Sequence, residues 1–224
     1  MLDINIIIQW FRKNITKTDV LIIVGLAALY ACTRLLNLEA LPIFSDEGIY
    51  IEWSRVAWKD ASLRFISLTD GRQPLQTWAT IPFLKLLPNQ ALVAGRLFSV
   101  SAGLFALSGL VSSVWYLFNK RTAYIAGLLY IVTPYFLFYD RIALVDSAVN
   151  GFTIWMFFFS ILLARTLRLD VAIILGFLSG FALLGKSSVR LYAGLMLFAS
   201  MLVVYTHEEG GVLGMLTRLK DKLM

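Results

Sequence analysis

Long apolar runs separated by short polar connections recur along most of the chain. Each run is close to the roughly 20 residues that an α-helix needs to cross the apolar layer of a bilayer. The pattern therefore predicts an all-α fold, a polytopic membrane helical bundle of about six transmembrane helices. We place the spans near residues 20–38, 92–117, 122–139, 142–164, 170–186 and 190–206.

The connections differ in charge. Four of them carry unpaired positive charge, namely "FRKNITK" (11–17), "NKR" (119–121), "RTLR" (165–168) and "TRLKDK" (217–222). Because lysine and arginine accumulate in cytoplasmic loops, we assign these connections and both termini to the cytoplasm of a cell-membrane protein. The loop 39–91, "YDRIA" and "GKSSVR" then lie on the non-cytoplasmic side. We expect residues 1–18 to form an amphipathic segment on the cytoplasmic surface.

The loop 39–91 predicts two helices that lie flat on the outer membrane surface. Between Asp46 and Asp60, the apolar residues Ile49, Trp53, Val56 and Ala57 recur with helical spacing on one face. Ser45 is a favourable N-cap for this helix. A second apolar segment, 74–87, begins with a proline, which is favoured at a helix start. We treat residues 1–224 as one membrane module whose active site lies in this loop.

Composition supports the membrane class and excludes several others. Hydrophobic residues make up 59% of the chain and mean hydropathy is +0.76, against roughly 45–50% apolar residues in soluble domains. The net charge of +6 comes from scattered residues without a basic face, so we expect contact with membrane lipids and no nucleic acid. Cys32 has no cysteine to pair with, and His207, the sole histidine, lies on the cytoplasmic side, away from any zinc site at the outer mouth. Residues 180–187 fit a phosphate-loop pattern, but they lie in an apolar span without a neighbouring strand pattern, which argues against nucleotide hydrolysis.

Asp146 is the acid that stands out most. We place it about one turn inside its span, where a carboxylate costs up to roughly 2.5–3.5 kcal/mol. Asn150 follows at i+4 and Thr153 at i+7, so a polar ridge faces the bundle interior. One interpretation is a structural salt bridge to Arg141 or Arg96. The other is a ligand or metal contact at the outer mouth of the bundle.

Asp46 and Glu47 lie side by side in the first turn of the first surface helix, where the helix dipole stabilises anions. Acids are common at helix starts, so capping alone explains them. An ionised carboxylate facing the same mouth as Asp146 also suits a general base or a ligand of a divalent cation such as Mg²⁺ or Mn²⁺. Cations on this side either reach out to the membrane interface or bind an anionic headgroup such as a phosphate; they are Arg72, Arg141 and Lys186.

An ordered series of segments resembles the N-terminal module of GT-C superfamily glycosyltransferases, closest to the protein O-mannosyltransferases and the lipid A aminoarabinose transferase. After a first span come "SDEGIY", "RQPLQTW", "AGRLFSVSAGLFAL", "YDRIALVDSAVNGF" and "GKSSVRLYAG", together covering roughly residues 20–195. The resemblance implies transfer of a sugar from a polyprenyl-phosphate carrier to a protein, lipid or glycan acceptor on the non-cytoplasmic face. This chain reads Arg72-Gln73-Pro74-Leu75 where the family commonly has Lys-Pro-Pro-Leu or His-Pro-Pro-Leu. Family members are usually longer, so we expect the chain to lack their C-terminal part.

The resemblance also assigns roles to residues. Asp46 matches the catalytic acid/base position, with Glu47 beside it as a supporting residue. Asp146 matches a second acidic position, and Lys186 a basic residue near the carrier phosphate. The predicted set is therefore Asp46 and Glu47 as catalytic residues, and Asp146, Arg72, Arg141, Lys186, Tyr50 and Asn150 as substrate-binding residues, with Asp46 and Asp146 as candidate ligands of Mg²⁺ or Mn²⁺.

Two other functions fit an intramembrane charge cluster. A transporter or flippase would use it as a substrate pathway, and a non-catalytic subunit would keep the fold without the reaction. Transporters tend to contain inverted repeats and broken helices near the bilayer midplane. The sequence has no visible repeat, and its charges gather at one face under a long loop, which favours an interfacial enzyme.

Overall fold

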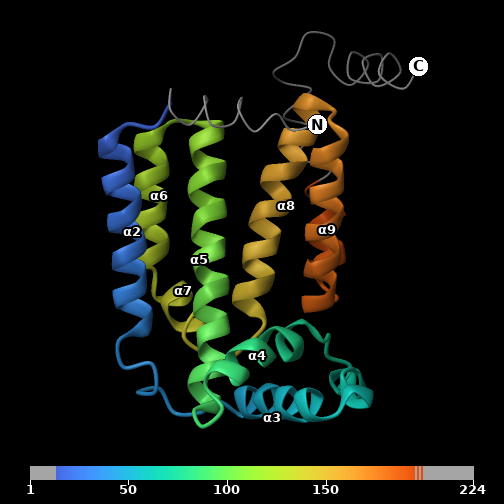
Figure 1. Ribbon diagram of the computed structural model, residues 1–224. Coiled ribbons are helices and arrows are strands. Elements are labelled where there is room, and N and C mark those ends of the chain that lie inside the picture. The colour runs from blue at the N-terminus through green and yellow to red at the C-terminus, as the bar shows by residue number, and fades with distance from the viewer. Residues whose placement is uncertain (1–13, 195, 197, 199–224) are drawn as a thin grey trace, which may run out of the picture.

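The computed structural model describes residues 14–194, 196 and 198, and all regular structure within them is helical. Upright helices stand side by side, and α3, α4 and α7 lie at one end of the bundle (Figure 1). This arrangement confirms the predicted all-α bundle. The upright helices are α2 (Lys17–Leu35), α5 (Ala91–Leu117), α6 (Lys120–Val132), α8 (Asp146–Thr166) and α9 (Leu169–Gly185); α3 (Ser45–Lys59), α4 (Leu75–Leu86) and α7 (Pro134–Tyr139) lie at the end, with short 3₁₀ turns η1 (Ala61–Leu63) and η2 (Ile66–Asp70).

Three of the described helices, α2, α5 and α8, are long and apolar enough to cross a membrane, and α9 is apolar but shorter, at 17 residues. The prediction of one continuous span over 122–139 is wrong, because the helix is interrupted between α6 and α7. Thr133 adopts an extended conformation before Pro134, and a proline both disfavours helical geometry in the residue before it and lacks the N–H a helix requires. Most of the span predicted at 190–206 lies outside the described residues.

The described cationic connections lie at one end of the bundle, and the loop with α3 and α4 lies at the other. The start of α2, the α5–α6 connection and the α8–α9 connection meet at one end, whereas α3 and α4 lie at the other (Figure 1). At the first end, the Lys120 ammonium lies 2.5 Å from an Asp19 carboxylate oxygen. The structure thus gathers the described cationic connections at the end remote from α3 and α4, as the charge pattern predicted. Which end faces the cytoplasm stays a prediction.

Helix α5 packs against α6 on one side and α8 on the other. Gly151 of α8 allows the second contact, because a Cβ atom there would lie 2.9 Å from the Phe105 ring and 3.2 Å from the Ala102 carbonyl oxygen, both on α5. Such close approach of two backbones through a small residue is a common way for membrane helices to associate. The α5–α8 pair is therefore closely packed, and the end helices α3 and α4 contact α5 while α7 contacts α8.

Helix α3 forms in the predicted place, but with a different cap and a different buried face. Phe44 is the N-cap, and Ser45, predicted as the cap, is the first helical residue. The predicted apolar face is only partly buried, since Ile49, Trp53 and Val56 keep intermediate exposure. The buried face of α3 consists of Glu47, Tyr50, Ile51, Ser54 and Ala57, so an acidic residue lies in the contact between α3 and the bundle.

Candidate active site

A charged cavity of about 350 Å³ opens between the end helices and the bundle. Its walls come from α3, the segment before α4, the start of α8 and the segment after α9. Five of the predicted site residues line it: Asp46, Tyr50, Arg72, Asp146 and Lys186. Backbone and neutral side chains complete the wall, and the Gln73 amide donates a hydrogen bond of 3.2 Å to the Ser187 hydroxyl across it. We call this space the charged cavity.

Asp46 and Arg72 form the ion pair at one wall of the charged cavity. Arg72 Nη1 and Nη2 lie 3.1 and 3.2 Å from the two Asp46 carboxylate oxygens, and Arg72 Nε lies 3.0 Å from Asp70. The guanidinium also stands over the Tyr50 and Trp53 rings, at 5.4 and 6.0 Å from their centroids. The hydrogen bond to Asp46 raises the pKa of Arg72, so it stays cationic. Two carboxylates and two rings thus fix one guanidinium facing the cavity.

Tyr50 lies between Arg72 and the bundle. Its side chain is buried, and this burial raises the pKa of the phenol above its usual value. The hydroxyl therefore keeps its proton at neutral pH and remains a hydrogen-bond donor.

Asp146 and Lys186 form a second ion pair at the opposite wall, with 2.8 Å between Nζ and Oδ1. The structural salt bridge predicted for Asp146 therefore exists with a different partner, since Arg96 and Arg141 are both engaged elsewhere. Its predicted depth is also wrong: α8 begins at Asp146, so the carboxylate sits in the first turn of the helix rather than one turn inside a span. A helix start favours a carboxylate there.

Glu47 points away from the charged cavity into the protein. Its side chain is fully buried, and Arg96 Nε and Nη2 donate hydrogen bonds of 2.9 and 2.8 Å to it. The backbone N–H groups of Phe44 and Ala143 donate two more, of 3.0 and 2.7 Å. Burial alone would raise the pKa of Glu47, but these hydrogen bonds outweigh it and the pKa falls below its ordinary value of 4.5. Both carboxylate oxygens are occupied by contacts that hold the first turn of α3 against α5 and the 140–145 segment.

A second cavity of about 300 Å³ adjoins the first. Asp146, Lys186 and Ser188 line both spaces, so the Asp146–Lys186 ion pair forms the partition between them. Asn150, predicted to bind substrate, lines only this second space. Its other walls are largely aromatic and hydroxylated: Tyr135, Phe136, Tyr139, Tyr192, Ser147 and Thr153, with Asp140. We call it the tyrosine cavity.

Arg141 does not line either cavity. Its guanidinium donates to the carbonyl oxygens of Thr33, Leu36 and Asn37, at 3.3, 2.9 and 2.6 Å. It therefore secures the end of α2 against the segment that leads into α8. Its predicted role in substrate binding has no support from this geometry.

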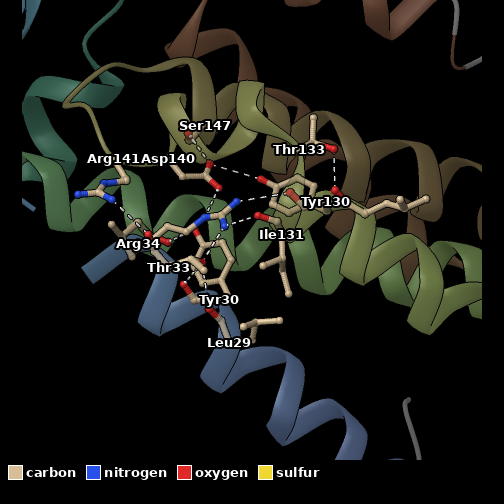
Figure 2. A network of polar contacts seen from close by, with 12 residues as sticks. Leu29, Tyr30, Thr33, Arg34, Tyr130, Ile131, Thr133, Asp140, Arg141 and Ser147 are labelled. Atoms are coloured by element: carbon tan, nitrogen blue, oxygen red, sulfur yellow. Dashed lines mark hydrogen bonds and ion pairs between the residues drawn. The ribbon is translucent and has the colours of Figure 1, made fainter. Parts of the chain in front are cut away.

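A buried network behind the tyrosine cavity was missed from the sequence (Figure 2). Arg34 Nε lies 3.5 Å from Asp140 Oδ2, and both side chains are buried. Asp140 Oδ1 accepts hydrogen bonds from Ser147, at 2.8 Å, and Tyr130, at 3.4 Å. Arg34 also donates to the Ile131 carbonyl oxygen at 2.6 Å, capping the end of α6. The only sequence signal was an arginine in the last turn of an apolar span.

The donor set fits a divalent cation poorly. Among the described residues, no group of three or more His, Cys, Asp or Glu side chains could hold a metal ion. Both oxygens of Asp46 contact Arg72, and Asp146 contacts Lys186. A cation such as Mg²⁺ prefers several oxygen ligands and would have to displace these partners. The two basic side chains already supply positive charge where a metal would.

The family model for dolichyl-phosphate-mannose-protein mannosyltransferases matches residues 72–213, more than half of the chain. The chain belongs to this family. It is thus a membrane glycosyltransferase of the GT-C type. No curated protein and no solved structure matches the chain.

The mannosyltransferase match begins at Arg72 and includes Asp140, Asp146, Asn150 and Lys186. Asp46 lies before it. What ties Asp46 to the matched part is geometry, because its carboxylate is paired with Arg72, the first matched residue. Membership of a transferase family also favours an enzyme over the transporter considered above.

Proposed function

We propose that this mannosyltransferase-family protein transfers a sugar from a polyprenyl-phosphate carrier to an acceptor hydroxyl or amine in the charged cavity. The observation that carries the proposal is the combination of two accessible carboxylates, Asp46 and Asp146, and two cations around a single space. The side chain of Asp46 is 38% exposed, unlike that of the neighbouring Glu47, which is fully buried. Asp46 is therefore the acid of the pair that can reach a substrate.

The reaction needs a base and a site for the departing phosphate. The acceptor oxygen or nitrogen forms a bond to the anomeric carbon, its proton passes to the Asp46 carboxylate, and the bond from the anomeric carbon to the phosphate oxygen breaks with its electron pair. The phosphate leaves as an anion. Arg72 and Lys186 face the same cavity and stabilise the developing negative charge. Attack and departure on opposite faces of the sugar would invert the anomeric centre.

Glu47 takes a supporting part in this scheme. Its four hydrogen bonds fix the first turn of α3, so the adjacent Asp46 is held toward the cavity. We infer that Glu47 is a positioning residue and that Asp46 is the base.

Sidedness follows from the charge pattern. The end that carries α3 and α4 lies opposite the cationic connections, so we infer that the charged cavity opens on the non-cytoplasmic side. Polyprenyl-phosphate sugars and membrane lipids approach laterally there, and the acceptor protein, lipid or glycan approaches from the aqueous side.

The test is a transfer assay in reconstituted membranes with a panel of polyprenyl-phosphate sugars, including the mannose form. We expect Asp46→Asn to reduce the transfer rate by at least about 100-fold, since a general base typically contributes 10²–10⁴-fold. Asp60→Asn is the matched control: it removes one charge from the other end of α3, and asparagine still caps η1. Transfer by Asp46→Asn at the rate of Asp60→Asn would remove Asp46 from the mechanism.

A further inference from the structure

We propose that the tyrosine cavity is a binding subsite for one neutral sugar ring. The inference deepens the proposed function and rests on it, since it names the part of the substrate that the second cavity holds. The charged cavity and this cavity share only the Asp146–Lys186 partition and Ser188. A ligand with an anionic part and a neutral part could therefore occupy both spaces at once.

The charges of the two cavities differ. The charged cavity is lined by two cations, Arg72 and Lys186, and by two carboxylates, Asp46 and Asp146. The tyrosine cavity has one cation, Lys186, and two carboxylates, Asp140 and Asp146. Asp140 is paired with buried Arg34, and Asp146 with Lys186. The tyrosine cavity therefore offers a phosphate group one cation that is already paired, against two cations in the charged cavity. It suits a ligand with hydroxyl groups, for which carboxylates are good hydrogen-bond acceptors.

Aromatic rings form much of the wall. Tyr135 and Tyr139 pack with their centroids 4.6 Å apart, and Tyr135 and Tyr192 are 61% and 44% exposed. The face of an aromatic ring carries partial negative charge, which attracts the C–H groups on the face of a pyranose ring. Phe136, which also lines the cavity, stacks on the Tyr130 ring with centroids 4.3 Å apart. Accessible tyrosine faces therefore suit a flat, neutral, polyhydroxylated ring.

A polar ridge faces these rings from α8. Asn150 and Thr153 line the cavity, and the Thr153 hydroxyl is buried without a hydrogen-bond partner. An unpaired buried hydroxyl costs free energy that a ligand hydroxyl would recover. The volume of about 300 Å³ lies at the lower end of the range for small-molecule sites. It matches one monosaccharide better than a polyprenyl chain or an oligosaccharide.

The binding test uses the full chain in lipid nanodiscs. Saturation-transfer NMR detects methyl α-mannopyranoside and methyl β-glucopyranoside, and broadening of the phosphorus-31 signal detects inorganic phosphate. We expect a methyl glycoside to bind, and Thr153→Val and Tyr192→Leu each to weaken it about two- to tenfold, the worth of one hydrogen bond or ring contact. Thr153→Val is nearly isosteric and keeps the test valid if Tyr192→Leu folds poorly. Tyr116→Leu is the matched control, because Tyr116 is similarly exposed, at 39%, and lies in the last turns of α5. Equal glycoside binding by wild type and both cavity variants, or none by wild type, would overturn the proposal.

Two further experiments are needed. One distinguishes a donor sugar from an acceptor sugar, and the other distinguishes failure of the subsite proposal from failure of the proposed function. Displacement of a labelled short-chain polyprenyl-phosphate mannose by the methyl glycoside assigns the ring to the donor. Glycoside binding without displacement assigns it to the acceptor, and both results support a sugar subsite. Arg72→Gln should lose phosphate binding and keep glycoside binding. Retained glycoside binding in an Asp46→Asn variant that still transfers sugar would refute the proposed base while leaving the subsite intact.

Discussion

Removing the charge of Glu47 is the sharpest test of how the site is held. In Glu47→Gln the side chain keeps its shape, but the amide nitrogen cannot accept the two hydrogen bonds that the oxygen it replaces now receives, one from Arg96 and one from a backbone N–H. Arg96 would remain fully buried with its charge uncompensated, although it also donates to the Leu38 and Leu41 carbonyl oxygens at 2.6 and 3.0 Å. Breaking a buried pair by removing one partner costs about 3–5 kcal/mol.

The expected shift is large enough to measure. For a chain of this size, 1 kcal/mol corresponds to about 2–4 °C in Tm, so Glu47→Gln should melt roughly 6–20 °C below wild type. The measurement is thermal unfolding of purified protein in one detergent at one scan rate. Glu52→Gln is the control on the same helix: Glu52 is 63% exposed and 3.7 Å from Arg55, and should change stability by no more than about 0.5 kcal/mol.

The stabilising effect of Glu47 should also depend on pH. Its pKa in the folded protein lies below the ordinary 4.5, so the folded state binds fewer protons than the unfolded state in this range. The stabilisation is then fully present above about pH 4.5 and is lost as the pH falls through the folded pKa. The Tm difference between wild type and Glu47→Gln should therefore narrow on acidification below 4.5. If Glu47→Gln had the same Tm as the control Glu52→Gln at neutral pH, the reasoning would be refuted.

Three further predictions follow from the same geometry. Arg72→Lys should lower the transfer rate about 10- to 100-fold, because lysine cannot span both Asp46 oxygens and Asp70; a rate within twofold of wild type would contradict it. EDTA should leave transfer unchanged, and a loss restored by added Mg²⁺ or Mn²⁺ would show that a metal takes part. Gly103→Ala should lower the free energy of unfolding by about 1–3 kcal/mol, measured by denaturant titration, because the added methyl overlaps the Tyr30 hydroxyl and the Asp140 carboxylate. Gly176→Ala, with open space around it, should instead be neutral or stabilising by up to about 1 kcal/mol.

Several parts of the site could be predicted because they depend on local pattern. Apolar runs of sufficient length predicted α2, α5 and α8, and the pattern of the loop 39–91 predicted the two end helices. The charge of the connections predicted that Asp46, Arg72 and Lys186 lie at one end. The break at Thr133–Pro134 was overlooked although proline signals it. The Arg34–Asp140 pair had no such signal, since its residues are far apart in sequence and an arginine near a span end is ordinary.

The family resemblance assigned the catalytic position to Asp46 and a supporting role to Glu47, but the physical reason for this difference lies in the tertiary structure. Adjacent residues on a helix point about 100° apart, so one carboxylate faces the cavity and the other the interior, and helix spacing alone does not say which. The rotation of α3 is set by Arg96 and the Ala143 N–H, 49 and 96 residues away from Glu47. Likewise, Asp146 found its partner 40 residues later in Lys186. The sequence determined which segments are helical and which charges share an end, because hydrophobic length and charge are local properties. The packing of α3 on α5 and of α8 on α9 decided which carboxylate is accessible, because that depends on contacts between distant segments.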